Sequence, residues 1–298
     1  MPKQVTDSRS SFVLDSCNVR GVYVRLDAAW QSIHQASDYP SAVKQVLGEA
    51  SAAIAALSSL IKFKGSMVLQ IQQTSPVKML VAQASDDNTL RAMASVSEEV
   101  IADDASFKDL FGKGNILISA EQKKGNSRYQ SVVALDDKGL ASTLEAYFAN
   151  SEQLFTALFF AVNDDTASVL MIQSLPTDEQ GFDEEGWQHA LSLAKTIKDE
   201  ELLTLPIETL LHRLYHADDV RLYAPQSLAF QCSCSQQKVE SSLKSIPFNE
   251  LQSLMEEQGE IKMNCQFCDQ DYIFTDLSLF VDTVDANANL ALPEDKLH

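Results

Sequence analysis

The sequence lacks the long apolar runs that a membrane protein needs. A spanning helix requires about 18 consecutive apolar residues, and the most apolar run here, residues 154–162, is short, contains Thr156 and is interpreted as a buried strand. The N-terminus, Met-Pro-Lys-Gln-Val-Thr-Asp, also lacks the apolar segment of a secretion signal. We therefore expect a cytoplasmic protein rather than a membrane or secreted one.

Positive charge is scarce as well. Lysine and arginine total 23 residues against 42 aspartates and glutamates, which gives a formal net charge of -19. Such a field repels phosphate backbones and anionic lipid surfaces, so neither nucleic acid nor membrane is expected as a partner. Because 45% of the residues are apolar, the chain can bury a substantial core without help from disulfides.

Cysteine is rare, but its placement is informative. Four of the five cysteines form two tight pairs near the C-terminal end, Cys232-Ser-Cys234 and Cys265-Gln-Phe-Cys268. Two such pairs can converge on one tetrahedral ion, and in a reducing compartment paired cysteines indicate metal or redox chemistry. The spacing favours one zinc ion per chain, with an iron–sulfur cluster or resting disulfides as alternatives.

A zinc site of this kind can be permanent or switchable, and the spacing alone favours a permanent structural zinc ribbon. However, each pair can also close on itself as a disulfide when oxidised. A structural zinc contributes about 10–16 kcal/mol, comparable to the whole stability of a domain, about 5–15 kcal/mol. Disulfides that close such short loops would restore only about 1–2 kcal/mol each. We therefore expect the C-terminal module to unfold on oxidation.

The fold class is predicted to be α+β, with three parts at residues 1–176, 177–229 and 230–298. The first part should hold a short helix capped by Asp27, an alanine-rich helix from Pro40 to about Leu60, and a helix behind a capping box, Ser142-Thr-Leu-Glu145. Strand patterns occur at 20–26, 65–72, 77–82, 90–96, 115–120, 129–135, 153–162 and 167–175.

The second part, 177–229, reads as a metastable helical linker from about Phe182 to Val220. Its helices are short, and short helices are marginal unless their apolar face docks on a neighbour. If the linker loosens, exposed apolar side chains could bind unfolding proteins. The candidates for this client surface are Trp187, Leu191, Leu210 and Leu214.

The third part, 230–298, is predicted to be a small zinc-binding module. It should contain a helix at 247–258 that ends at Gly259, and two strands, 260–264 and 272–274, joined by the turn that holds Cys265 and Cys268.

Other chemistry-bearing residues give weaker signals. His212 and His216 are interpreted as partly exposed histidines, Cys17 as an unreactive thiol near the core edge, and Gly112-Lys-Gly114 as a turn rather than a phosphate loop. The acidic pairs Glu184-Glu185 and Glu256-Glu257 are interpreted as solvated faces. Since no catalytic constellation can be assembled, we do not expect an enzyme.

Several motifs together resemble one family, the redox-regulated chaperone heat shock protein 33, over nearly the whole chain. The most specific are Phe230-x-Cys232-x-Cys234-Ser235 and Cys265-x-Phe267-Cys268 with Tyr272 and Phe274. The remaining matches are Arg20-Gly21, Tyr39-Pro40, Leu60-x-Lys62-Phe63-x-Gly65, Gly112-x-Gly114, Tyr129-Gln130, Tyr147-Phe148, Ser151-Glu152-Gln153-Leu154, Glu200-Glu201-Leu202-Leu203 and Arg213-Leu214.

The resemblance implies a cytoplasmic holdase that works without ATP, in which the four cysteines hold zinc while the chaperone is idle. It further implies that oxidation forms the disulfides Cys232–Cys234 and Cys265–Cys268, releases zinc and unfolds the linker. The active form would commonly be a homodimer that binds unfolding client proteins. Helices packed between β-sheets are implied for the N-terminal part.

The chain departs from the family pattern at three positions where glycine is usual, namely Ala92, Ser131 and Asp269. Asp269 follows the last cysteine, and aspartate tolerates a left-handed backbone better than most residues. Two rival functions stay open on the residues alone. One is a thiol–disulfide oxidoreductase using Cys265 and Cys268, which lacks the expected βαβ context, and the other is a zinc scaffold that never releases its ion.

Overall fold

The structure is a computed structural model of the whole chain and describes residues 6–97, 100–122, 128–176 and 182–280. The chain divides into two compact units, Met1–Gln231 and Cys232–His298. Each unit has its own hydrophobic core. In the part of the chain that is described, helices that are both long and apolar enough to cross a bilayer are absent.

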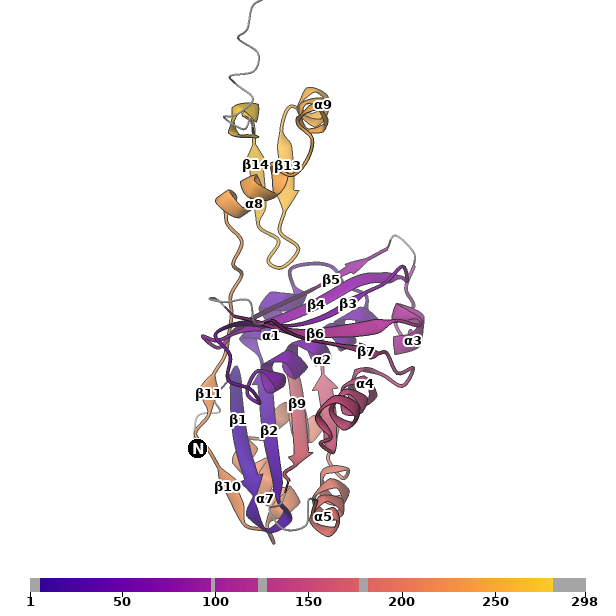
Figure 1. Cartoon of the computed structure of the whole chain (residues 1–298), viewed down its shortest axis with the longest axis vertical. Coiled ribbons are helices and arrows are strands. Elements are labelled where there is room, and N and C mark those ends of the chain that lie inside the picture. Colours follow the sequence, from indigo (N-terminus) through magenta and orange to yellow (C-terminus); the bar gives the residue numbers. More distant parts are fainter. Residues whose placement is uncertain (1–5, 98–99, 123–127, 177–181, 281–298) are drawn as a thin grey trace, which may run out of the picture. The chain divides into compact units, whose positions relative to one another are not determined.

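Two mainly antiparallel sheets frame the first unit (Figure 1). The first sheet has the strand order β10-β1-β2-β9-β8, with β11 also paired to β1, and the second has the order β12-β5-β4-β3-β6-β7. Their strands are β1 (Ser8–Leu14), β2 (Val19–Leu26), β3 (Gly65–Gln72), β4 (Val77–Ser85), β5 (Thr89–Val96), β6 (Asn115–Gln122), β7 (Arg128–Ala134), β8 (Thr156–Val162), β9 (Ala167–Ser174), β10 (Val220–Leu222), β11 (Gln226–Ser227) and β12 (Ala229–Phe230).

The alanine-rich helix α2 (Ser41–Leu57) lies between the two sheets and contacts strands of both. Alanine has a small side chain, so the helix can be enclosed on several sides without forcing the sheets apart. The predicted helix is confirmed, but it ends at Leu57 rather than near Leu60. The hydroxyls of Ser58 and Ser59 bond back to carbonyls at 2.9 and 2.6 Å. The alanines with no exposed surface are Ala50, Ala52, Ala53, Ala55 and Ala56.

Three short helices cover the other face of the first sheet. They are α5 (Glu184–Ala194), α6 (Asp199–Thr204) and α7 (Ile207–Tyr215), as the helical pattern of 182–220 predicted. Their apolar side chains join those of β1, β2, β8 and β9 in one buried cluster. Two buried tyrosines fasten the layer. The Tyr23 hydroxyl donates to the Leu202 carbonyl at 2.9 Å, and the Tyr215 hydroxyl to the Ala190 carbonyl at 3.1 Å.

Residues 220–230, which we call the edge strap, cover one edge of each sheet. β10 and β11 pair with β1 at the edge of the first sheet, and β12 pairs in parallel with β5 at the edge of the second. The Gln231 amide donates to the Leu90 carbonyl at 3.1 Å. The chain therefore passes from the second sheet directly to Cys232.

The second unit has a small core. Its elements are α8 (Gln236–Leu243), α9 (Phe248–Gln258), the hairpin β13 (Ile261–Asn264) and β14 (Asp271–Phe274), and a 3₁₀ turn at Leu277–Phe280. Gly259 ends α9 with a left-handed φ of 75°, as predicted. Among the described residues, the buried core consists of Leu243, Leu251, Ile261, Phe274 and Phe280.

Two capping predictions were wrong. Asp27 precedes α1 (Ala28–His34) but does not cap it; the Asp7 carboxylate instead accepts the first amides, at 2.8 to 3.2 Å. Asp27 itself pairs with Arg25.

The expected capping box at Ser142 is also absent, because α4 (Leu140–Tyr147) already begins after Gly139. A true box occurs at Ser106 and Asp109, before α3 (Phe107–Phe111). The strand expected from residue 153 starts only at Thr156, because a π-helical turn (Phe148–Glu152) and Gln153 with φ 56° precede it.

Candidate metal centre

The four C-terminal cysteines come from two different local structures. Cys232 and Cys234 lie in the extended stretch before α8, whose N-terminus is capped by the Ser235 hydroxyl. Cys265 and Cys268 lie in the turn between β13 and β14. The Cys265 amide donates to the Gln270 carbonyl at 3.0 Å, and the Cys268 amide to the Cys265 carbonyl at 3.2 Å. These bonds fold the turn so that both thiols reach the first pair.

The four sulfurs fit a tetrahedral ion. All four Sγ atoms lie within 4.8 Å of one another. The Sγ atoms of Cys232 and Cys265 are 3.6 Å apart, and those of Cys234 and Cys268 are 3.4 Å apart. A zinc ion with Zn–S bonds of about 2.3 Å requires sulfurs about 3.8 Å apart. The group can therefore bind a metal with little movement, and its half-buried thiols remain within reach of small solutes.

The electrostatics of the group favour a cation. Burial opposes ionisation of Cys234, but hydrogen bonds from the Tyr272 hydroxyl and then from the other thiols outweigh it and lower the pKa of Cys234 to about 7. Burial raises the pKa of Cys265 and of Cys268, and thiol neighbours add to the effect. One thiolate forms readily near neutral pH, and its negative charge opposes ionisation of the neighbouring thiols. A bound divalent ion would remove that repulsion.

The substitution of aspartate for the family's glycine after the last cysteine is accommodated. Asp269 has φ 58°, in the left-handed region that the usual glycine predicts. The Asn264 side-chain amide donates to the Asp269 carboxylate at 2.8 Å and to the Asp271 carboxylate at 2.9 Å. The other two departures lie in regular strands, with Ala92 opposite Ala82 and Ser131 opposite Ile118.

The four candidate client-binding residues all lie in the layer formed by α5, α6 and α7. Leu210 has no exposed surface, and Trp187 and Leu214 are also buried. Leu191 is partly buried against the same cluster. In this structure the candidate surface is therefore covered by the first sheet.

The structure shows where the residues with weaker sequence signals lie. His212 and His216 are exposed, with ring centroids 6.0 Å apart, and join no group of three ligands among the described residues. Gly112 ends α3 in a turn, as predicted. Glu184 and Glu185 are exposed at the start of α5, and Glu256 and Glu257 are exposed on α9.

Cys17 lies beside two other side chains that could bind a metal, which the sequence did not predict. Cys17, His189 and Asp218 each offer a ligand atom within 4.8 Å of the other two. Burial raises the pKa of the Cys17 thiol, and the carboxylates of Asp218 and Asp183 add to this effect. The three residues are far apart in the chain, so no sequence signal pointed to the group.

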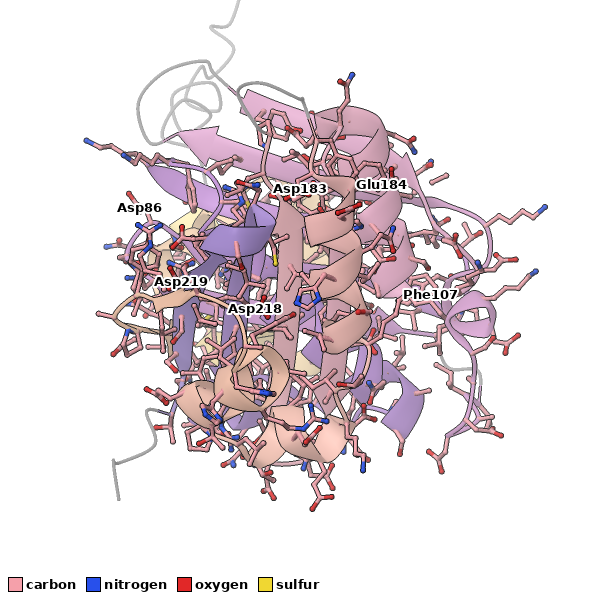
Figure 2. All side chains as sticks on the ribbon, turned by 90° about the horizontal axis from the view of Figure 1, so that it is seen from below. Asp86, Phe107, Asp183, Glu184, Asp218 and Asp219 are labelled. Atoms are coloured by element: carbon pink, nitrogen blue, oxygen red, sulfur yellow. The ribbon has the colours of Figure 1, made fainter. Side chains whose placement is uncertain are left out.

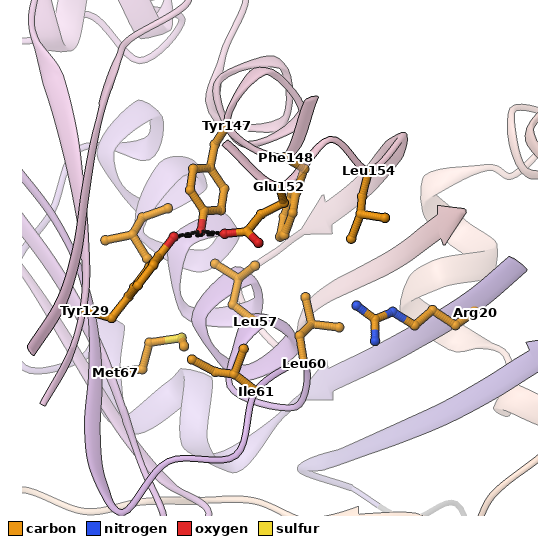
Figure 3. Close-up of a pocket in the computed structure, with 11 residues that line it drawn as sticks. Arg20, Leu57, Leu60, Ile61, Met67, Tyr129, Tyr147, Phe148, Glu152 and Leu154 are labelled. Carbon is orange, nitrogen blue, oxygen red and sulfur yellow. Dashed lines mark hydrogen bonds between the residues drawn. The ribbon is translucent and has the colours of Figure 1, made fainter. Parts of the chain in front are cut away.

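An apolar cavity of about 200 Å³ lies elsewhere in the first unit (Figure 3). The hydroxyls of Tyr129 and Tyr147 are hydrogen-bonded to each other at 2.6 Å, and each lies within hydrogen-bond distance of the Glu152 carboxylate, at 2.9 and 3.0 Å. Burial and these neighbours raise the pKa of Tyr147, so the hydroxyl stays protonated. Aliphatic and aromatic side chains line the rest, including Leu57, Leu60, Met67 and Phe148.

The architecture is that of an α+β unit joined to a small unit with a four-cysteine cluster. Residues 7–275 match the family described as "Hsp33 protein". The chain is 38% identical over 283 residues to the 33 kDa chaperonin of Neisseria meningitidis serogroup A, covering 95% of this chain and 91% of that protein. It is 40% identical over 273 residues to the 33 kDa chaperonin of Pseudomonas aeruginosa, with 90% and 92% covered.

The chain therefore belongs to the Hsp33 family, whose named members are chaperones. A crystal structure of the 33 kDa chaperonin (heat shock protein 33 homolog) from Thermotoga maritima has the same fold. It matches with a TM-score of 0.77 at 20% identity, over 92% of this chain and 96% of that one.

Proposed function

We propose that this protein is a redox-regulated, ATP-independent chaperone that holds unfolding client proteins after its four C-terminal cysteines are oxidised. The observation that carries it is the convergence of four half-buried thiols in a unit with a five-residue buried core among the described residues, in a member of the Hsp33 family. Zinc, when bound, would hold the four thiolates together and supply their counter-charge.

The chemistry begins at one thiolate of the first pair. The Cys234 thiolate attacks a peroxide oxygen, which gives a sulfenic acid and a hydroxide ion that takes up a proton to become water. The neighbouring Cys232 thiol then attacks that sulfur, and a disulfide and a second water form. Cys265 and Cys268 react in the same way, so each pair loses two protons and two electrons to one peroxide. Four thiolate ligands are lost, and with them the site for the ion.

Which cysteines form disulfides with each other decides whether the second unit stays folded. Bonds within each pair close loops of three or four residues and constrain the unfolded chain by about 1–2 kcal/mol each. Bonds across the pairs, at the 3.6 and 3.4 Å contacts, would close separations of 33 and 34 residues respectively and contribute about 4 kcal/mol each. Pairing within each pair, as the resemblance to the family implies, would therefore leave the two segments untied and favour unfolding.

Unfolding of the second unit is proposed to loosen the segment 177–229. This segment enters the second unit through the edge strap, whose strands are only two or three residues long. Its release would expose Trp187, Leu191, Leu210 and Leu214, the proposed client surface. Short helices without a docking partner do not persist in water, which supports this step.

The test follows zinc, disulfides and activity in one sample. We expect reduced, zinc-loaded protein to leave light scattering by a heat-denatured client unchanged, and peroxide-treated protein to suppress it. A colorimetric chelator should detect about one zinc released per chain, and peptide mapping should find Cys232–Cys234 and Cys265–Cys268. Ser233→Ala is the matched control, because it alters the exposed residue between Cys232 and Cys234 without removing a thiol and should switch normally.

Three results would contradict this function. Equal suppression by both forms would remove the switch, retention of zinc through oxidation would favour a permanent scaffold, and catalytic reduction of insulin with a dithiol donor would favour an oxidoreductase. A cytoplasmic location and a homodimeric active form complete the proposal. Size-exclusion chromatography of the oxidised protein tests the dimer.

A further inference from the structure

A mixed set of metal-binding side chains meets where the helical layer joins the first sheet. Cys17 ends the 3₁₀ turn (Asp15–Cys17) between β1 and β2, His189 lies on α5, and Asp218 follows α7. The His189 Nε2 atom is 3.1 and 3.2 Å from the two carboxylate oxygens of Asp218. The Cys17 Sγ atom lies 3.8 Å from Asp218 Oδ1.

These separations match the distances between ligand atoms in a metal site. In a tetrahedral zinc site, sulfur and oxygen ligands lie about 3.5 Å apart, and nitrogen and oxygen ligands about 3.3 Å apart. The Ser16 hydroxyl is 3.6 Å from Cys17 Sγ and 3.5 Å from Asp218 Oδ1. It donates toward the Asp218 carboxylate beside the Cys17 thiol.

The surrounding contacts hold the three ligands in place. The Asp183 carboxylate caps α5 through the Gly186 amide and accepts a bond from the Asn18 side chain at 3.1 Å. A Cβ atom on Gly186 would lie 2.7 Å from the Cys17 carbonyl, so the lack of a side chain lets α5 approach this turn. The Asp218 amide donates to the Tyr215 carbonyl at 3.0 Å.

Burial and charge suit a cation. Cys17 is 4% exposed, and the Asp218 side chain is 9% exposed, whereas the His189 side chain is 49% exposed. The ion would therefore be held on the inner side and reached from the solvent side. Asp183 adds a second carboxylate nearby, and Figure 2 shows both Asp183 and Asp218 on the face seen from below.

The arrangement does not suit a catalytic cysteine. A nucleophilic thiol needs a base that takes its proton. Here the thiol faces the Asp218 carboxylate, which accepts its hydrogen bond, and the same carboxylate occupies His189 Nε2. A shared divalent cation uses all three groups without that conflict.

We propose that Cys17, His189 and Asp218 form a second metal site for a thiolate-binding divalent cation such as Zn²⁺, separate from the four C-terminal cysteines. The ion joins the β1–β2 turn, α5 and the turn after α7. Its binding therefore stabilises the docked helical layer. This site does not depend on the proposed chaperone activity.

The test uses the full chain, reduced and loaded with one equivalent of zinc for the four C-terminal cysteines. Titration with Co²⁺ should add one ion per chain and produce the near-ultraviolet absorption of a cobalt–thiolate bond. Loss of an outer-shell partner typically weakens metal binding by about 10- to 100-fold, so His189→Gln and Asp218→Asn should weaken it at least that much. Cys17→Ser should abolish the thiolate band.

The matched controls are Asp219→Asn, which removes an exposed carboxylate one residue away, and His212→Gln, which removes an exposed histidine of α7. Both should bind Co²⁺ as the unaltered chain does. Absence of additional cobalt would overturn the assignment. So would a thiolate band that persists unchanged in His189→Gln, because the ion would then sit at the C-terminal cysteines. Hydrogen exchange provides a second readout, in which metal should slow amide exchange in α5.

Discussion

Leu210→Ala tests whether docking of the helical layer conceals the client surface. Leu210 has no exposed surface and packs in the cluster that joins α5, α6 and α7 to the first sheet. Truncation of a buried leucine to alanine costs about 2–5 kcal/mol. If α7 opens locally, a loss of about 3 kcal/mol raises its open population roughly 100-fold, since each 1.4 kcal/mol is a factor of ten.

Two measurements on reduced, zinc-loaded protein check this reasoning. Amide hydrogen exchange should accelerate in α7 and in the helices packed with it, and the reduced variant should suppress client aggregation without an oxidant. Thr209→Ala is the matched control, because Thr209 is exposed beside Leu210 and surface changes usually stay within about 0.5 kcal/mol.

The two measurements test the packing estimate and the location of the client surface separately. Unchanged exchange in α7 would refute the estimate drawn from packing. Faster exchange without suppression of aggregation would show that undocking these helices does not expose the client surface.

Further predictions concern individual backbone and side-chain positions. Asp269→Ala should destabilise the second unit by about 1–2 kcal/mol, because alanine is strained at φ 58°; Asp269→Gly should not, and denaturant titration compares the two. Gly21→Ala should cost about 3 kcal/mol by the same assay, because the added Cβ would lie 2.0 Å from a ring carbon of the fully buried Phe12. Burial raises the pKa of Glu49 above its ordinary value of 4.5; the charge therefore destabilises the fold above pH 4.5, where the unfolded chain ionises. Glu49→Gln should raise Tm at pH 7 and leave it unchanged below pH 4.5, and an equal gain at both pH values would refute this explanation.

The sequence predicted the elements whose signal is local. The apolar period of α5 and α7 and the strands on either side of Cys265 and Cys268 agree with the structure. The tight cysteine pairs likewise predicted convergence, because neighbours two or three residues apart already share a direction, and the four sulfurs do meet.

Features that depend on tertiary contacts were missed. The three short strands of the edge strap acquire strand geometry by pairing with β1 and β5, which lie far from them along the chain. Asp7 replaced Asp27 at the start of α1 because the fold brings a distant carboxylate to those amides. Cys17, His189 and Asp218 meet for the same reason. Side chains 29 to 201 positions apart leave no spacing to recognise.

The edge strap has a consequence for how an unfolding polypeptide could be bound. While it is seated, its short strands occupy the outward-facing amides and carbonyls of β1 and β5. Release of the edge strap would leave one unpaired edge on each sheet, and an unpaired edge can pair with any extended chain. Recognition there would rely on main-chain groups, which every polypeptide carries, and would therefore be indifferent to the sequence of the captured segment.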